Sequence, residues 1–283
     1  MRPISIFTIV ETETTPTLSW RDRLPWRRPA GFSVTGKPGA PYNRLLLEFP
    51  LDAREEELHR RAARGFEKIF SLGASGVVLP KRFPFARLAA EYGLAAATPV
   101  PLYRRMAGRI ACFAADEIGL SSDMSVALLA RRATPALLAA AETLRHRAKG
   151  LNVWAGSDTE PLRTALRHEH GISAQSGRLI GSDIYIFFEV PDFALSVPDD
   201  AVVLNFSGGS PAVLGGLTAD GARIEPPAAL LPDCPESCDI QCLLSAFAAS
   251  EMLNISDIRI KGLTAGGKSL GLLRKRAPFC FDG

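Results

Sequence analysis

The fold is decided by two neighbouring stretches, Met124-Ser125-Val126-Ala127-Leu128-Leu129-Ala130 and, four residues later, Pro135-Ala136-Leu137-Leu138-Ala139-Ala140-Ala141. The first is continuously apolar, which is typical of a strand buried on both faces of a sheet. The second is alanine-rich, with Thr134 in place to cap a helix and Pro135 at its first position. A buried strand that turns directly into a helix indicates a parallel sheet with helical crossovers.

The same alternation extends over most of the chain. Apolar runs predict strands at 4–10, 45–49, 76–80, 95–98, 151–155, 172–174, 184–189 and 201–206, and helical spacing predicts helices at 55–72, 85–92, 102–118, 135–148, 159–170 and 240–253. We therefore expect a three-layer α/β fold with a mostly parallel sheet. The expected division is a smaller α/β portion at 1–122, with an irregular arm at 11–44, and a Rossmann-like portion at 123–283 that ends in a helix and a hairpin.

Composition excludes several classes of protein. Of the 283 residues 47% are apolar and 22% are charged, so disorder is not expected for the whole chain. A net charge of +3 lacks the strong basic bias of a dedicated nucleic-acid binder. No apolar run approaches the roughly 18–20 residues of a membrane helix. We expect a cytoplasmic protein with reduced cysteines that binds neither membranes nor nucleic acids.

A family resemblance rests on four segments: Leu151-Asn152-Val153-Trp154-Ala155-Gly156-Ser157, Glu169-His170-Gly171-Ile172, Ser182-Asp183-Ile184-Tyr185-Ile186 and Ala201-Val202-Val203-Leu204-Asn205. In these segments, and in its order of strands and helices, residues 124–209 resemble the dinucleotide-binding domain of shikimate-dehydrogenase-like proteins. The resemblance covers under a third of the chain. It implies NAD or NADP bound where the first strand of the domain turns into the first helix.

The turn at that place departs from the family. It reads Ala130-Arg131-Arg132-Ala133-Thr134-Pro135, whereas a dinucleotide site needs the glycines of G-x-G-x-x-G so that the backbone can approach the pyrophosphate. NAD(P) therefore stays an alternative, held atypically through Arg131, Arg132, Thr134 and the loop of Ser157. The two arginines would add charge for a phosphate or carboxylate at the helix N-terminus, or they are ordinary surface cations.

Polar residues follow two later strands, where ligands of open α/β sheets bind. Ser157 and Asp158 follow one strand, and they would cap the next helix, or Asp158 would accept a hydrogen bond from a ribose hydroxyl. Ser207, Gly208 and Gly209 follow another strand, and they would line a ligand crevice or form an ordinary turn.

The segment Gly76-Val77-Val78-Leu79-Pro80-Lys81 resembles the strand–Pro–Lys segment that holds the family's catalytic lysine. The Asn and Thr that precede the proline in the family are absent, and the spacing to the lysine is shorter by one. Lys81 is therefore a candidate general acid or base, with a surface lysine as the other interpretation.

Two further motifs have competing interpretations. Residues 262–269 match the phosphate-binding pattern G-x-x-x-x-G-K-[ST], but the apolar alternation on both sides of Gly266-Gly267 favours a hairpin turn over a phosphate site at Lys268. The four-residue spacing of Cys234, Cys238 and Cys242 suits metal ligands that lack an obvious fourth partner, or cysteines that pack a helix.

These observations predict a small-ligand-binding or regulatory protein on a Rossmann-like scaffold that lacks the dinucleotide glycines. The expected partners are a small anionic ligand and a second copy of the chain, in a homodimer. An atypical NAD(P)-dependent oxidoreductase is the first alternative, and phosphate or nucleotide binding through 262–269 is the second. No combination of residues identifies a reaction.

Overall fold

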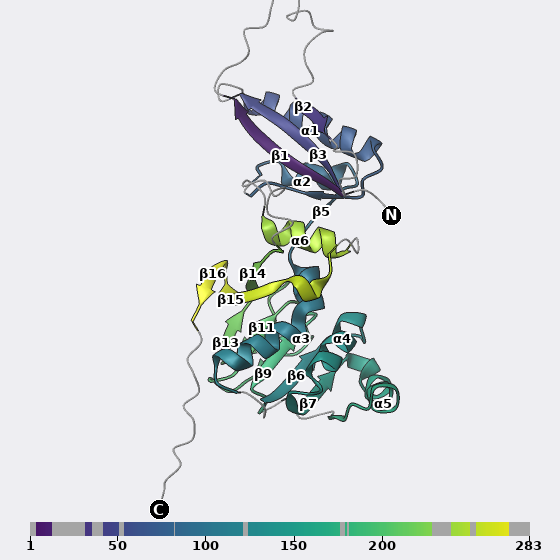
Figure 1. The fold of residues 1–283 in the computed structure, drawn as a ribbon, viewed down its shortest axis with the longest axis vertical. Coiled ribbons are helices and arrows are strands. Elements are labelled where there is room, and N and C mark those ends of the chain that lie inside the picture. Colours follow the sequence, from purple (N-terminus) through teal and green to yellow (C-terminus); the bar gives the residue numbers. More distant parts are fainter. Residues whose placement is uncertain are drawn as a thin grey trace, which may run out of the picture. The chain divides into compact units, whose positions relative to one another are not determined.

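The computed structural model describes residues 4–12, 32–35, 42–50, 54–81, 83–120, 124–175, 179, 181–227, 239–249 and 253–271. The chain forms two compact units (Figure 1). The first unit combines Met1–Pro99 with Pro226–Asn254, and the second unit combines Val100–Glu225 with Ile255–Gly283. Both are mixed α/β structures, as the strand–helix alternation predicts.

The first unit is built on a five-stranded sheet in the order β2-β3-β1-β4-β5. Strands β3, β1, β4 and β5 are parallel, and the edge strand β2 is antiparallel to β3. The elements of this unit are β1 (Ile4–Thr12), β2 (Phe32–Thr35), β3 (Tyr42–Pro50), α1 (Glu55–Ser71), β4 (Gly76–Val78), α2 (Ala86–Glu91), β5 (Ala95–Ala96) and α6 (Ile240–Ala249). Strand β2 lies within the expected arm at 11–44, and β1 and β3 extend into it. Residues 13–31 and 36–41 of the arm are outside the described residues.

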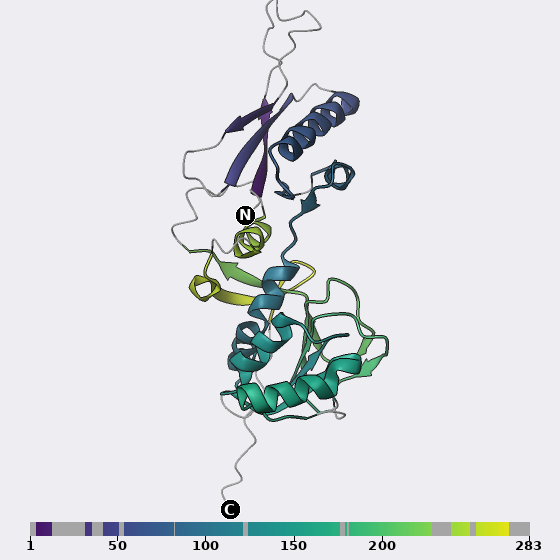
Figure 2. The same cartoon turned by 90° about the vertical axis from the view of Figure 1, so that its right-hand side faces the viewer.

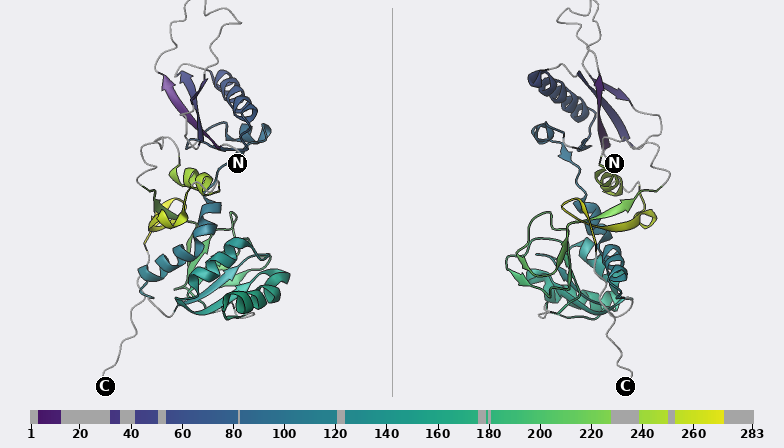
Figure 3. Two further views of the ribbon diagram at one scale, coloured as in Figure 1. Left: turned by 45° about the vertical axis from the view of Figure 1, so that its right-hand side comes forward. Right: turned by 90° about the vertical axis from the view of Figure 1, so that its left-hand side faces the viewer.

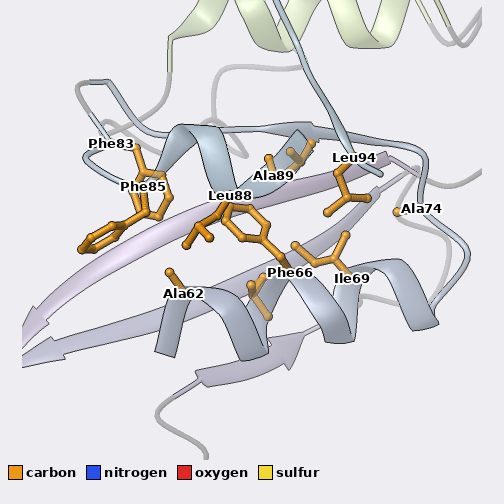
Figure 4. Packing of buried hydrophobic residues seen from close by; sticks show 11 residues of the cluster. Ala62, Phe66, Ile69, Ala74, Phe83, Phe85, Leu88, Ala89 and Leu94 are labelled. Carbon is orange, nitrogen blue, oxygen red and sulfur yellow. The ribbon is translucent and has the colours of Figure 1, made fainter. Parts of the chain in front are cut away.

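Helix α1 covers this sheet with one apolar stripe. Ala62, Phe66 and Ile69 are buried at helical spacing, and Figure 4 shows them turned toward the interior. Phe83 and Phe85 come from the segment before α2, and Phe66 packs edge-on against Phe83 with 6.1 Å between ring centroids. In both views of Figure 3, α1 runs alongside the strands.

The second unit contains a six-stranded, fully parallel sheet in the order β13-β11-β9-β6-β7-β8. Its strands are β6 (Met124–Leu129), β7 (Ala148–Trp154), β8 (Ala174–Gln175), β9 (Ile184–Phe187), β11 (Val202–Asn205) and β13 (Leu217–Ala219). Numbered along the chain from β6, these strands have the order 3-2-1-4-5-6 when read from β8. This is the strand order of the Rossmann fold, so the expected Rossmann-like architecture is confirmed.

The two faces of this sheet are covered differently. Helices α3 (Val100–Glu117) and α4 (Pro135–Leu144) lie on one side in Figure 2, and the segment around β10 (Leu195–Ser196) and β12 (Val213–Leu214) lies on the other. The core beneath the segment around β10 and β12 is formed by Ala127, Leu129, Tyr185, Phe187 and Val203. Their neighbours along each strand are equally buried, because the sheet has an apolar layer on both sides.

A smaller antiparallel sheet completes the second unit. It consists of β14 (Gly221–Glu225), β15 (Arg259–Ala265) and β16 (Lys268–Leu270), in that order. Strands β15 and β16 form a hairpin around Gly266 and Gly267, with φ angles of 55° and 76°, so the predicted hairpin turn is confirmed.

Two boundaries differ from the sequence expectation. Helix α4 ends at Leu144 instead of residue 148, because Ala148 already pairs with Met124 in the β6–β7 ladder and this pairing overrides the helix propensity of the alanines. The division of the chain lies before Val100 instead of at residue 122, because α3 packs against α4 and β9 of the second unit. Across the described parts of the chain, every helix is too short or too polar to cross a bilayer.

Candidate functional site

The strand order of the second unit reverses between β6 and β9, and ligands of such sheets bind outside the carboxyl ends of the strands at this point. The strand ends lie level with one another: Phe188 N donates to Leu129 O at 2.8 Å, and Phe206 N donates to Phe187 O at 2.9 Å. We call this region the switch-point edge. It comprises residues 130–134 after β6, 155–158 after β7, 188–193 after β9 and 206–210 after β11.

The turn between β6 and α4 is the place where a dinucleotide pyrophosphate would lie. Two of its backbone N–H groups already have anionic partners from the protein. Arg131 N donates to Glu189 Oε2 at 2.8 Å, and Ala133 N donates to Asp158 Oδ2 at 3.1 Å. Leu137 N donates to Thr134 Oγ1 at 3.2 Å, so the predicted N-cap is confirmed. Two amides of the turn that could bind a phosphate, those of Arg131 and Ala133, are therefore occupied by carboxylates.

The two arginines of the turn have different surroundings. Arg131 is exposed, and its Nε donates to Val190 O at 2.7 Å, which fixes its side chain against the loop after β9. Arg132 is also exposed, and it makes no hydrogen bond or ion pair with any described residue. Of the two, Arg132 is the cation that a ligand could reach without displacing an internal contact.

The loop after β7 lies directly against this turn because Gly156 permits the approach. A β-carbon on Gly156 would stand 2.6 Å from Arg131 O, and its φ of 56° belongs to the left-handed region that favours glycine. In a Rossmann dinucleotide site the glycines belong to the first turn itself and admit the ligand. Here the glycine is in the neighbouring loop, and it admits Asp158 instead.

The helix after this loop is α5 (Thr159–His170), preceded by a 3-10 turn η1 (Gly156–Asp158). Asp158 occupies the N-cap position of α5 as expected, but its side chain makes no cap hydrogen bond because it bonds Ala133 N and accepts from Ser157 Oγ at 3.3 Å. Thr159 closes the turn instead, with Oγ1 donating to Gly156 O and accepting from Ala155 N.

The loop after β11 uses its polar side chains internally. Ser207 Oγ donates to Asn205 Oδ1 at 2.6 Å and accepts from Gly209 N at 3.1 Å, while Gly208 has a φ of 78°. From α3, Arg104 donates to Phe206 O at 2.9 Å and to Ser207 O at 2.8 Å. Gly209 approaches Val190 so closely that a β-carbon would meet its side chain at 2.8 Å, so the loops after β9 and β11 touch.

The remaining candidates lie elsewhere. Lys81 is exposed and follows β4, at the carboxyl end of the parallel strands of the first unit. Lys268 begins β16, so a strand runs through the position at which a P-loop helix would begin. Cys242 is half-buried on α6, whereas Cys234 and Cys238 lie outside the described residues.

Three contributors to the switch-point edge were not identified from the sequence. Glu189 follows the apolar run of β9 directly, and this carboxyl-end position is a signal that could have indicated it. The contact of Gly156 with Arg131 and the hydrogen bonds of Arg104 join residues far apart in the chain, and no local pattern indicates them.

No protein-family model matches this sequence, and no curated protein matches it. Two solved structures are distantly similar. One is L-tryptophan dehydrogenase from Nostoc punctiforme, with a TM-score of 0.29 and 11% identity over 72% of this chain and 62% of that chain, so this chain spans less than two thirds of its length. The other is ornithine transcarbamoylase from Giardia lamblia, with a TM-score of 0.33 and 11% identity over 88% of this chain and 84% of that chain. The Rossmann-like assignment of the second unit rests on its strand order.

Proposed function

We propose that this is a small-ligand-binding, regulatory protein of the cytoplasm, and that its Rossmann-like unit does not use the β6–α4 turn for a dinucleotide. The observation that carries the proposal is the occupation of that turn by Glu189 and Asp158. Self-association into a homodimer is part of the proposal, because two-fold homodimers are the commonest form among soluble oligomers.

Hydrogen-bond energies and charge repulsion support the proposal that this turn does not bind a pyrophosphate. A pyrophosphate would have to displace two hydrogen bonds to carboxylates, each worth about 1.5–3 kcal/mol. It would also approach two negative charges, and like charges at a few ångströms repel. The β-carbons of Arg131, Arg132 and Ala133 stand where a dinucleotide turn has glycines.

The groups left at the switch-point edge favour a ligand that carries hydrogen-bond donors. Glu189 and Asp158 each accept from the turn with one carboxylate oxygen. The other oxygen of Asp158 accepts from Ser157 Oγ, and the other oxygen of Glu189 remains an acceptor for a ligand. The half-buried Glu189 stands at the reversal of the strand order, where ligands of this fold bind. An amino or hydroxyl compound without phosphates therefore fits this edge better than a dinucleotide.

An atypical NAD(P)-dependent oxidoreductase is the competing function, favoured by the Rossmann strand order and by the exposed Arg132. It requires the cofactor to bind in spite of the carboxylates. In that case replacing Arg131 and Arg132 with alanine should weaken NAD(P) affinity about tenfold, because a charge-assisted hydrogen bond is worth about 1.5–3 kcal/mol.

The test is a thermal-shift screen of the full chain. The panel contains NAD, NADH, NADP, NADPH and ATP, and a set of nucleosides, amino acids and polyamines without phosphates. A ligand at about 100 times its dissociation constant stabilises the folded state by about 2.7 kcal/mol. We expect a stabilising compound from the second set, with stabilisation lost in Glu189→Gln and kept in the matched control Asp199→Asn, a change at an exposed carboxylate of the same unit outside the switch-point edge.

Dinucleotide binding that is lost in the Arg131→Ala/Arg132→Ala variant would refute the proposal and establish the oxidoreductase alternative once turnover of a hydroxy or keto substrate is seen. A panel in which no compound stabilises the protein would contradict small-ligand binding and leave regulation through a protein partner. The phosphate alternative at 262–269 predicts stabilisation by ATP that disappears in Lys268→Ala.

A further inference from the structure

A groove of about 450 Å³ opens on the second unit, away from every residue assigned to the switch-point edge. It is lined by one face of α3, by Thr143 near the end of α4, and by the first half of β15. Ligand pockets of proteins usually have volumes of about 300–1,000 Å³. The groove is therefore large enough for a metabolite.

The charge of the lining is predominantly positive. Arg109 comes from α3, and Arg259 and Lys261 come from β15. The carboxylate in the lining belongs to Asp116, which forms an ion pair with Arg147, and the hydrogen bond from Arg147 lowers the pKa of Asp116. The negative charge of the groove is thus matched by a cation of its own.

The three cations differ in whether their charge is already paired with a carboxylate of the protein. Lys261 pairs with Glu225 at 3.1 Å. Arg109 donates to the carbonyl oxygens of Ile255 and, at 2.7 Å, Ile258, which are neutral acceptors that fix the guanidinium without cancelling its charge. The side chain of Arg259 is exposed and makes no hydrogen bond or ion pair with any described residue.

The other lining groups suit the organic part of a ligand. Phe113 and Ile260 are half-buried and apolar. Cys112 is a free, half-buried cysteine, and burial raises the pKa of its thiol, so it stays neutral near pH 7 and adds no negative charge. Cationic side chains beside apolar ones suit an organic anion, because the cations bind its phosphate or carboxylate and the apolar groups contact the rest.

We propose that this groove binds a small organic anion, with Arg259 and the immobilised Arg109 holding its phosphate or carboxylate and Phe113 and Ile260 contacting its apolar part. This site is independent of the function proposed for the switch-point edge. Phenyl phosphate and phenylacetate share a phenyl group, so comparing them distinguishes binding of a phosphate from binding of a carboxylate. Inorganic phosphate serves as a probe that lacks the apolar group.

The experiment is calorimetric titration of the full chain with each probe. We expect phenyl phosphate or phenylacetate to bind, and Arg259→Ala to weaken the affinity about tenfold or more, as for the loss of a charge-assisted hydrogen bond. Arg259→Gln, which keeps the length of the side chain but removes its charge, serves as a second variant should the first fold poorly. Arg167→Ala is the matched control, because Arg167 is an exposed arginine of the same unit that does not line the groove.

A second measurement tests whether the probe binds in this groove. A saturating probe should slow alkylation of Cys112 by iodoacetamide, measured on the peptide by mass spectrometry, and leave the rate at Cys242 unchanged. The proposal is overturned if neither organic probe binds at about 10 mM, if the affinity is the same in Arg259→Ala and Arg167→Ala, or if Cys112 reacts equally fast with and without the probe.

Discussion

Replacing Gly156 with alanine should separate the contact between the two loops from ordinary backbone strain. Gly156 has a φ of 56°, and a β-carbon there would meet Arg131 O at 2.6 Å. The carbonyl cannot move freely, because Arg131 is fixed through its own N–H to Glu189 and through its side chain to Val190. The loop after β7 must therefore retreat from the turn.

The loss of unfolding free energy expected for Gly156→Ala has two contributions. An alanine in the left-handed region costs about 1–2 kcal/mol. Overpacking against a fixed neighbour costs about a further 1–3 kcal/mol. Gly171→Ala is the matched control, because Gly171 has a φ of 66° and nothing within 4 Å of the added β-carbon. Gly156→Ala should therefore lower the free energy of unfolding by about 1–3 kcal/mol more than Gly171→Ala.

The assay is urea unfolding followed by far-UV circular dichroism, with hydrogen exchange of the β6 and β9 peptides to follow the second unit separately. In Gly156→Ala the amide of Ala133 should also exchange faster, because the retreating loop takes Asp158 with it. Equal losses of stability in Gly156→Ala and Gly171→Ala, with unchanged exchange at Ala133, would refute the proposed contact between the loops.

Three further predictions concern single groups of the second unit. Tyr185→Phe removes a buried hydroxyl that accepts from Ser182 N at 3.2 Å, and it should lower the free energy of unfolding by about 1–3 kcal/mol in urea; an unchanged midpoint would contradict this. Thr134→Ala removes the cap of Leu137 N and should cost about 1 kcal/mol, whereas Thr134→Ser should restore it. Since burial raises the pKa of Cys112, its alkylation rate should rise with pH through a midpoint above that of the same cysteine in the urea-unfolded chain, and coincident midpoints would exclude the effect.

Much of the fold could be predicted because its signals are local. Continuous apolar runs indicate β6, β9 and β11 without reference to the rest of the chain, since a strand buried on both faces needs no alternation. Gly73, Gly119 and Gly171 all have positive φ angles just beyond helices, as their positions after helical patterns predict. Strand β13 has no such apolar run, because its three residues become a strand only by pairing with β11.

The sequence predicts only those parts of the candidate site that lie within one continuous segment. The turn without glycine and the cap by Thr134 are both visible in residues 130–135. The partners of the turn, Asp158 and Glu189, come from the loops after β7 and β9. These two strands flank β6 in the sheet but are separated from it along the chain. A single sequence does not show which carboxylate reaches which amide, because that depends on how closely two loops approach.

The turn carries two separate obstacles to a dinucleotide, and they can be told apart. Glu189 and Asp158 occupy the amides, and the β-carbons of the turn stand in the path of the pyrophosphate. Removing only the first, in Glu189→Ala/Asp158→Ala, should expose the amides but leave the path crowded, so the variant should not acquire NADH binding in a fluorescence titration. If it did bind NADH, the carboxylates alone would be the barrier. The missing glycines at 130–134 would then not be a barrier, and the oxidoreductase alternative would regain a route to its cofactor.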